Sequence, residues 1–155
     1  MSDVSSAAQP RIDAAALAGD ATATGFVGWD SALVEEFSTN RFNFQVGSSL
    51  LSETDQLRVW EVRLDPGQRL PTHRHVLDYF WTALTSGVGR QHIDDGSTRV
   101  VRYHAGETRH LDFGPGEYLL HDLENVGDTQ LLFITVEHKL KVEQLRAQEL
   151  VGEAS

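Results

Sequence analysis

Three histidines have the spacing expected of a metal site. His73 and His75 are separated by one residue, and His121 lies further along the chain, with Asn125 four positions after it. In a strand, alternate side chains point to the same face, so both imidazoles of the pair would point the same way. Two ligands on one face suit a single metal ion. Such a pair is also common by chance, and either ring can simply donate a hydrogen bond to a carbonyl group in the core.

The residues around these histidines resemble the two signatures of the cupin superfamily. The first signature runs from Gly67 through the histidine pair to Gly87. The second is carried by Gly106-Glu107, Pro115-Gly116, His121 and Asn125. The resemblance covers residues 58 to 139. It implies an all-β cupin barrel, also called a double-stranded β-helix or jelly roll, in which His73, His75 and His121 bind one metal ion.

Two departures from the family pattern affect the expected site. Phe80 stands where the family usually has a glutamate ligand, and the stretch from Gly106 to His121 is longer than the family spacing. Asp78 has the same strand parity as Phe80, so we expect both to face the histidines. Asp78 would then either reach the metal or hydrogen-bond a ligand histidine. The alternative is an ion pair with an arginine at the mouth of the barrel.

Within the superfamily, three segments resemble small single-domain cupins of the beta-alanine degradation type. These segments are His73–Tyr79, Leu84–Gly87 and Val136–Lys139. The match says little about chemistry. It indicates a subgroup of the superfamily but does not indicate a substrate.

Several other side chains are candidates for supporting roles. Tyr118 is the candidate acid or hydrogen-bond donor, because it lies three residues before His121. Arg90 is preferred over Arg74 as the residue that orients an anionic substrate. His110 is a candidate to replace or support His121. The remaining histidines and two tryptophans are interpreted as surface, core or wall groups: His92, His104, His138, Trp60 and Trp81.

Composition narrows the classes of function. A net charge of −10 argues against a nucleic-acid or membrane partner, since either would need a basic face. The absence of cysteine excludes disulfides, thiolate ligands and a cysteine nucleophile. A metal site must then use imidazole or carboxylate groups, which suits iron(II) first and also manganese, nickel, copper or zinc. The N-terminus lacks the features of a signal peptide and no stretch is long enough to span a membrane, so we expect a cytoplasmic protein.

The pattern of apolar residues predicts a single barrel domain. We expect a flexible N-terminal segment over 1–24, a cupin barrel over 25–138, and a C-terminal helix and tail over 139–155. A short N-terminal helix should run from an Asp30-Ser31 cap to Phe37. Alternation predicts that Trp60, Val62 and Leu64 face the core, and Asp94-Asp95-Gly96 reads as a hairpin turn. A partial apolar stripe on the C-terminal helix and the N-terminal strands favour a homodimer.

Three hypotheses for function remain open. The first is a mononuclear non-heme iron dioxygenase acting on a small chelating acid or diketone, because a carboxylate-free ligand set resembles that of three-histidine dioxygenases among the cupins. With no carboxylate ligand, the metal keeps its full charge and should favour an anionic substrate. The second is a metal-dependent isomerase, lyase or hydrolase that uses the ion as a Lewis acid. The third is a non-catalytic cupin that binds a metal or a small metabolite.

Overall fold

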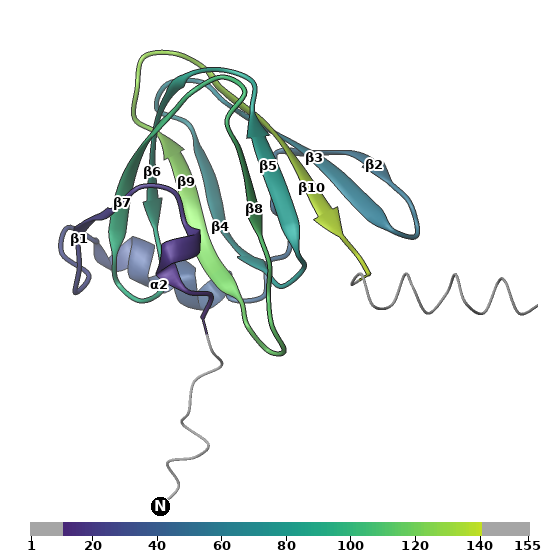
Figure 1. Ribbon diagram of the computed structural model, residues 1–155. Coiled ribbons are helices and arrows are strands. Elements are labelled where there is room, and N and C mark those ends of the chain that lie inside the picture. The colour runs from purple at the N-terminus through teal and green to yellow at the C-terminus, as the bar shows by residue number, and fades with distance from the viewer. Residues whose placement is uncertain (1–10, 141–155) are drawn as a thin grey trace, which may run out of the picture.

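The structure, a computed structural model, describes residues 11–140. Its strands form two antiparallel five-stranded sheets that face each other (Figure 1). In spatial order, the first sheet contains β1 (Ala21–Ala23), β7 (Thr98–Tyr103), β6 (Gly87–His92), β9 (Leu119–Asn125) and β4 (Arg69–His75). The second contains β2 (Ser49–Glu53), β3 (Leu57–Leu64), β10 (Leu131–His138), β5 (Tyr79–Ala83) and β8 (Thr108–Leu111). The predicted all-β jelly-roll architecture is confirmed.

The core fills the space between the two sheets. Strand β10 shows the pattern most clearly, because its residues alternate between buried and half-buried from Leu131 to His138. On β3, the residues predicted to face the core, Trp60, Val62 and Leu64, are buried. Strand alternation therefore gives each sheet one apolar face, and the two faces pack against each other.

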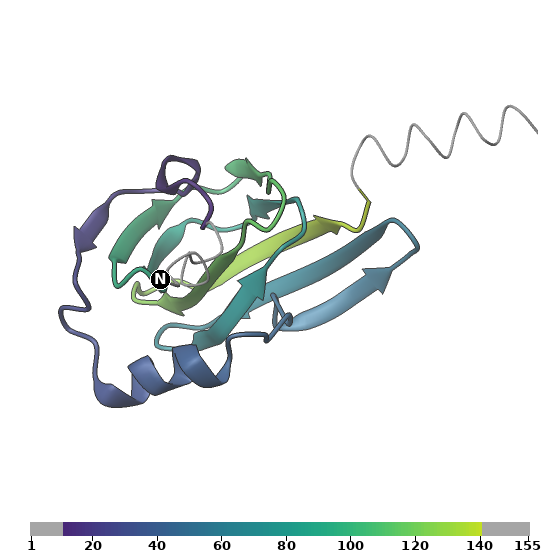
Figure 2. The same ribbon diagram turned by 90° about the horizontal axis from the view of Figure 1, so that it is seen from below.

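Helix α2 (Ser31–Thr39) lies outside the first sheet, as the view from below shows (Figure 2). The Asp30 side chain caps it by accepting a hydrogen bond of 2.8 Å from the Leu33 backbone N–H. Phe37 is the residue that the helix buries. The C-terminal helix predicted over 139–155 lies outside the described residues, except for its first two positions.

The structure describes the N-terminal segment predicted over 1–24 from Arg11 onward. From Arg11 onward it packs on the barrel: a short 3-10 helix, η1 (Ala14–Ala16), leads to β1, which pairs with β7. Ile12 and Ala18 are buried, and the Ile12 N–H donates a 2.9 Å hydrogen bond to the Tyr118 carbonyl. The segment has few large apolar side chains, but its small residues fit closely against the barrel, which composition alone did not reveal.

The predicted turn at Asp94-Asp95-Gly96 is present, and a second turn precedes β4. Asp94-Asp95-Gly96 connects β6 to β7, with Gly96 at a φ of 87° that favours glycine. The turn before β4 has Gly67 at the same φ of 87°. Within residues 11–140, no helix has the length and apolar character needed to cross a membrane.

Candidate metal centre

The structure brings His73, His75 and His121 together in the interior. The first two lie on β4 and the third on β9, where His121 is directly opposite His73 in the strand pairing. All three are buried, with exposed fractions of 2 %, 3 % and 8 %. One nitrogen from each ring lies within 4.8 Å of those of the other two. No carboxylate of residues 11–140 joins this group.

Hydrogen bonds orient two of the three rings. His73 Nδ1 donates to the Pro71 carbonyl at 2.8 Å, and His121 Nδ1 lies 2.8 Å from Gln91 Oε1. Because carbonyl oxygens only accept, both rings carry their hydrogen on Nδ1 and keep a lone pair on Nε2. His75 is held differently: its ring stacks on Tyr79 with centroids 4.0 Å apart and planes 9° from parallel.

Burial keeps the three rings uncharged. It lowers the pKa of His73 to about 4. The pKa values of His75 and His121 are also well below the ordinary range, first through burial and then through repulsion from the neighbouring histidines. Neutral imidazole is the form that binds a metal.

The donor set fits a divalent transition metal ion. His121 Nε2 and His75 Nδ1 are buried without a hydrogen-bond partner in the described part of the chain. A buried polar atom left unsatisfied costs about 1–3 kcal/mol, and metal coordination of the ring would relieve such a cost at His121 Nε2. Three imidazoles without a carboxylate or thiolate suit iron, nickel, copper or zinc.

The placement predicted for Phe80 is wrong. Its ring lies on the outer face of the second sheet, with centroids 5.2 Å from His110 and 6.1 Å from His138. The expectation came from the family position of the glutamate ligand, and alternation along the chain gives the opposite result, because Phe80 lies an odd five residues after His75 and Tyr79 an even four. Tyr79 faces the histidines instead.

Asp78 lies in that turn and does not join the histidines. Its carboxylate accepts a 2.8 Å hydrogen bond from the Phe113 backbone N–H. Its backbone carbonyl accepts another, also of 2.8 Å, from the His138 N–H. Asp78 therefore ties the start of β5 to the segment after β8 and to the end of β10, and it does not line the cavity described below.

Tyr118 lies on the outer face of the first sheet. Its hydroxyl donates to Asp94 Oδ2 at 2.7 Å, and the Arg74 guanidinium lies 4.0 Å from the ring centroid. It packs with Phe37 and Leu120, not with the histidines. Tyr118 and His121 are three residues apart, and an odd separation puts two side chains on opposite faces of a sheet. The sequence alone could therefore have shown that Tyr118 points away from the histidines.

The histidines open onto an interior cavity of ≈ 60 Å³. At about 30 Å³ for each water molecule in the liquid, this is room for about two waters or a small ligand. Polar side chains that sequence reasoning did not assign to a site also line it, namely Tyr79, Gln91, Tyr103, Arg109 and Thr135. The rest of the wall is mainly apolar, so the few polar groups would set how a ligand is oriented.

The two arginines considered for substrate binding do not line this cavity. Arg90 forms a 2.8 Å ion pair with Glu124, and Arg74 packs over Phe42 as well as Tyr118. Among the arginines of residues 11–140, Arg109 reaches the cavity wall. It is paired with Trp81 across β5 and β8, and such partners share a face of the sheet.

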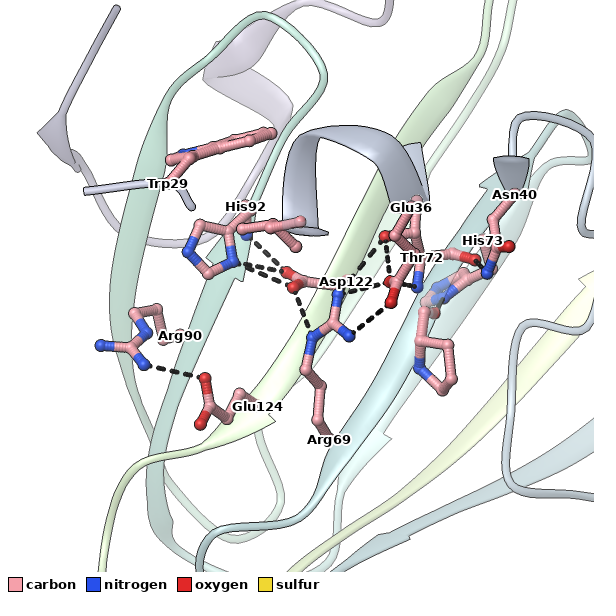
Figure 3. Close-up of polar contacts among 12 residues, drawn as sticks. Trp29, Glu36, Asn40, Arg69, Thr72, His73, Arg90, His92, Asp122 and Glu124 are labelled. Atoms are coloured by element: carbon pink, nitrogen blue, oxygen red, sulfur yellow. Dashed lines mark hydrogen bonds and ion pairs between the residues drawn. The ribbon is translucent and has the colours of Figure 1, made fainter. Parts of the chain in front are cut away.

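A polar network behind the site connects helix α2 to both ligand strands (Figure 3). Asp122, which follows His121, is fully buried and accepts hydrogen bonds of 2.9 Å from Arg69 Nε and 2.6 Å from the His92 backbone N–H. Glu36 on α2 accepts from Arg69 and from both the backbone and the hydroxyl of Thr72, which precedes His73. The network therefore fixes the backbone beside His73 on β4, through Thr72, and beside His121 on β9, through Asp122.

No protein-family model matches the chain, and no curated protein matches it. Among solved structures, it is similar to a cupin domain from Bordetella pertussis Tohama I, with 23 % identity and a TM-score of 0.53 over 59 % of this chain and 91 % of that one. A conserved protein with a double-stranded β-helix domain from Klebsiella pneumoniae overlaps less well, with 25 % identity and a TM-score of 0.47 over 58 % and 73 % of the two chains. The similarity to beta-alanine degradation cupins stays a prediction. The first of these overlaps, together with the two facing sheets, shows that the chain has the cupin fold.

Proposed function

We propose that this protein is a metal-dependent enzyme in which His73, His75 and His121 hold one divalent transition metal ion. Iron(II) is the ion that we propose first. The observation that carries the proposal is the convergence of three buried, neutral imidazoles on a largely apolar cavity. Three protein ligands are typical of catalytic metal sites, because they leave room in the coordination sphere for a substrate.

The proposed reaction is the oxidation of a small chelating acid or diketone by dioxygen. When bound, the ion would supply Lewis-acid and, as iron(II), redox chemistry. A ligand set without negative charge favours an anionic substrate, since the substrate then provides the neutralising charge. The chain itself contributes a small cavity with apolar walls, which limits the entry of water and strengthens electrostatic interactions inside.

Metal analysis and oxygen uptake together test this proposal. Protein purified without chelator is analysed for metals, reloaded with iron(II) under anaerobic conditions, and screened for oxygen consumption with small keto acids, hydroxy acids and diketones. Oxygen uptake that requires both the metal and one of these compounds supports the dioxygenase. Turnover without oxygen would indicate an isomerase or lyase instead, and metal binding without turnover in either condition would indicate a binding protein.

A further inference from the structure

We infer that Arg109 and Tyr103 form an anion-binding subsite in the cavity, which selects a small substrate carrying a carboxylate or enolate group. The inference deepens the proposed function, because it names the chemical class of ligand that the cavity takes and the side chains that recognise it.

Arg109 is a cation on the cavity wall, and no carboxylate of the described residues pairs with it. Within residues 11–140, its buried Nε has no hydrogen-bond partner, and its Nη1 donates to the Ala16 carbonyl at 3.3 Å. The Arg109 side chain is half-buried, so solvent screens part of its charge, and the unpaired Nε is a feature that it shares with Arg99. What sets Arg109 apart from Arg99 is its place on the wall of the cavity that the histidines line. An anionic ligand in this cavity would form charge-assisted hydrogen bonds to the guanidinium.

Tyr103 is oriented as a hydrogen-bond donor by a chain of polar groups that begins at a ligand histidine. His121 Nδ1 donates to Gln91 Oε1, which fixes the direction of the amide, and Gln91 Nε2 then donates to the Tyr103 hydroxyl oxygen at 3.0 Å. The hydroxyl thus accepts from Gln91 and keeps its own hydrogen to donate. Burial raises the pKa of Tyr103 to about 12, so the hydrogen stays in place at neutral pH.

The rest of the wall limits the size and the polarity of the ligand. Six of its apolar side chains are Leu17, Val62, Leu70, Leu119, Leu123 and Phe133. A cavity of ≈ 60 Å³ takes a molecule with few non-hydrogen atoms. We therefore expect one anionic group held by Arg109 and Tyr103 on a short body.

A purely structural role for Arg109 is the competing explanation, because its bond to Ala16 also holds the N-terminal segment on the barrel. Arg99 provides a matched control. Its guanidinium donates to the Gly19 carbonyl of the same segment, but Arg99 does not line this cavity. If Arg109 only holds the N-terminal segment in place, as a clamp, replacing either arginine should weaken ligand binding to the same extent. If Arg109 belongs to an anion subsite, only its replacement should weaken the binding of an anion.

The test compares two probes of nearly the same shape on the zinc-loaded protein, where no redox turnover occurs. Pyruvate is anionic and pyruvamide is neutral, and binding of each is measured by isothermal titration calorimetry. We expect the wild type to prefer pyruvate and Arg109→Gln to lose about ten- to hundredfold of that preference, the worth of charge-assisted hydrogen bonds. Arg109→Lys, which keeps the charge, should retain most of it, and Arg99→Gln should retain all of it. Tyr103→Phe should weaken pyruvate binding by a smaller factor, about three- to tenfold.

The possible outcomes separate this inference from the proposed function. Zinc content is measured for every variant, and melting curves confirm that each is folded. A wild type that fails to bind zinc contradicts the metal centre, and the same probe pair then tests Arg109 in the metal-free protein. A wild type that binds pyruvate no more tightly than pyruvamide, or an Arg109→Gln variant with an unchanged preference, overturns the anion subsite. Equal losses in Arg109→Gln and Arg99→Gln overturn it as well, in favour of the clamp.

Discussion

Replacing Glu36 by glutamine tests how helix α2 holds the strand that carries two of the histidines. The Glu36 carboxylate bridges Arg69 and Thr72, with hydrogen bonds of 2.9 Å from Arg69 Nη1 and 2.7 Å from the Thr72 hydroxyl (Figure 3). The Arg69 hydrogen bond is the largest influence that lowers the pKa of Glu36, which falls to about 2. Glutamine keeps the shape of the side chain and removes its charge.

The change in the pKa of Glu36 determines how much folding free energy its carboxylate contributes and over which pH range this contribution is lost. A fall from 4.5 to about 2 corresponds to an upper limit of about 3 kcal/mol of folding free energy. Since 27 % of the side chain remains exposed and water screens the charges, we expect about 1–2 kcal/mol. A carboxylate with a depressed pKa stabilises the fold above its unfolded pKa. This contribution is lost as the pH falls from 4.5 toward about 2.

Urea unfolding of wild type and Glu36→Gln, followed by tryptophan fluorescence at pH 7, 5, 4 and 3, measures this difference. The variant should be less stable at pH 7 by about 1–2 kcal/mol, and the gap should narrow at pH 4 and pH 3. Glu35→Gln is the control, because Glu35 lies exposed on the same helix, takes part in none of the ion pairs of residues 11–140, and should change stability little. Equal stability at pH 7, or a deficit that does not change with pH, would contradict a stabilising role for the Glu36 carboxylate.

Three further predictions follow from the positions of individual side chains. Gln91→Leu should lower metal affinity about ten- to hundredfold in a chelator competition, because His121 loses its orienting acceptor; an unchanged affinity would contradict this. Phe80→Glu should leave metal affinity unchanged, since the residue lies on the outer face, and tighter binding would place it inside. The exposed Leu50 and Leu51 on edge strand β2 suggest a homodimer, so light scattering should give twice the chain mass of 17.2 kDa; a monomer at micromolar concentration would argue against it.

The sequence predicted those parts of the site that depend on local pattern. The His73–His75 spacing places both rings on one face wherever the segment is a strand, and the motif resemblance supplied His121. Alternation also identified the inward face of β3, which the burial of Trp60 and Val62 confirms. These predictions need only the period of a strand and not its partner.

The parts that failed depend on how far the family spacing holds and on how strands pair. The family position of the glutamate ligand placed Phe80 inside, but Phe80 lies five residues after His75, an odd separation, and faces outward. Tyr79, four residues after His75, faces in. Arg109 lies on the cavity wall because β8 pairs with β5 in one register, and a shift by one residue would have turned His110 inward instead. Such long-range pairing is not encoded in the spacing of nearby residues.

The most direct test of the central claim is the metal content of single alanine variants. Wild type, His73→Ala, His75→Ala and His121→Ala are incubated with excess zinc, desalted and analysed by mass spectrometry for bound metal. His110→Ala serves as the control, because His110 lies on the outer face beside Phe80. We expect one zinc ion per chain in the wild type and in the control, and clearly less than one in each of the three variants. Full metal content in all three variants would contradict the assignment of the histidines as metal ligands.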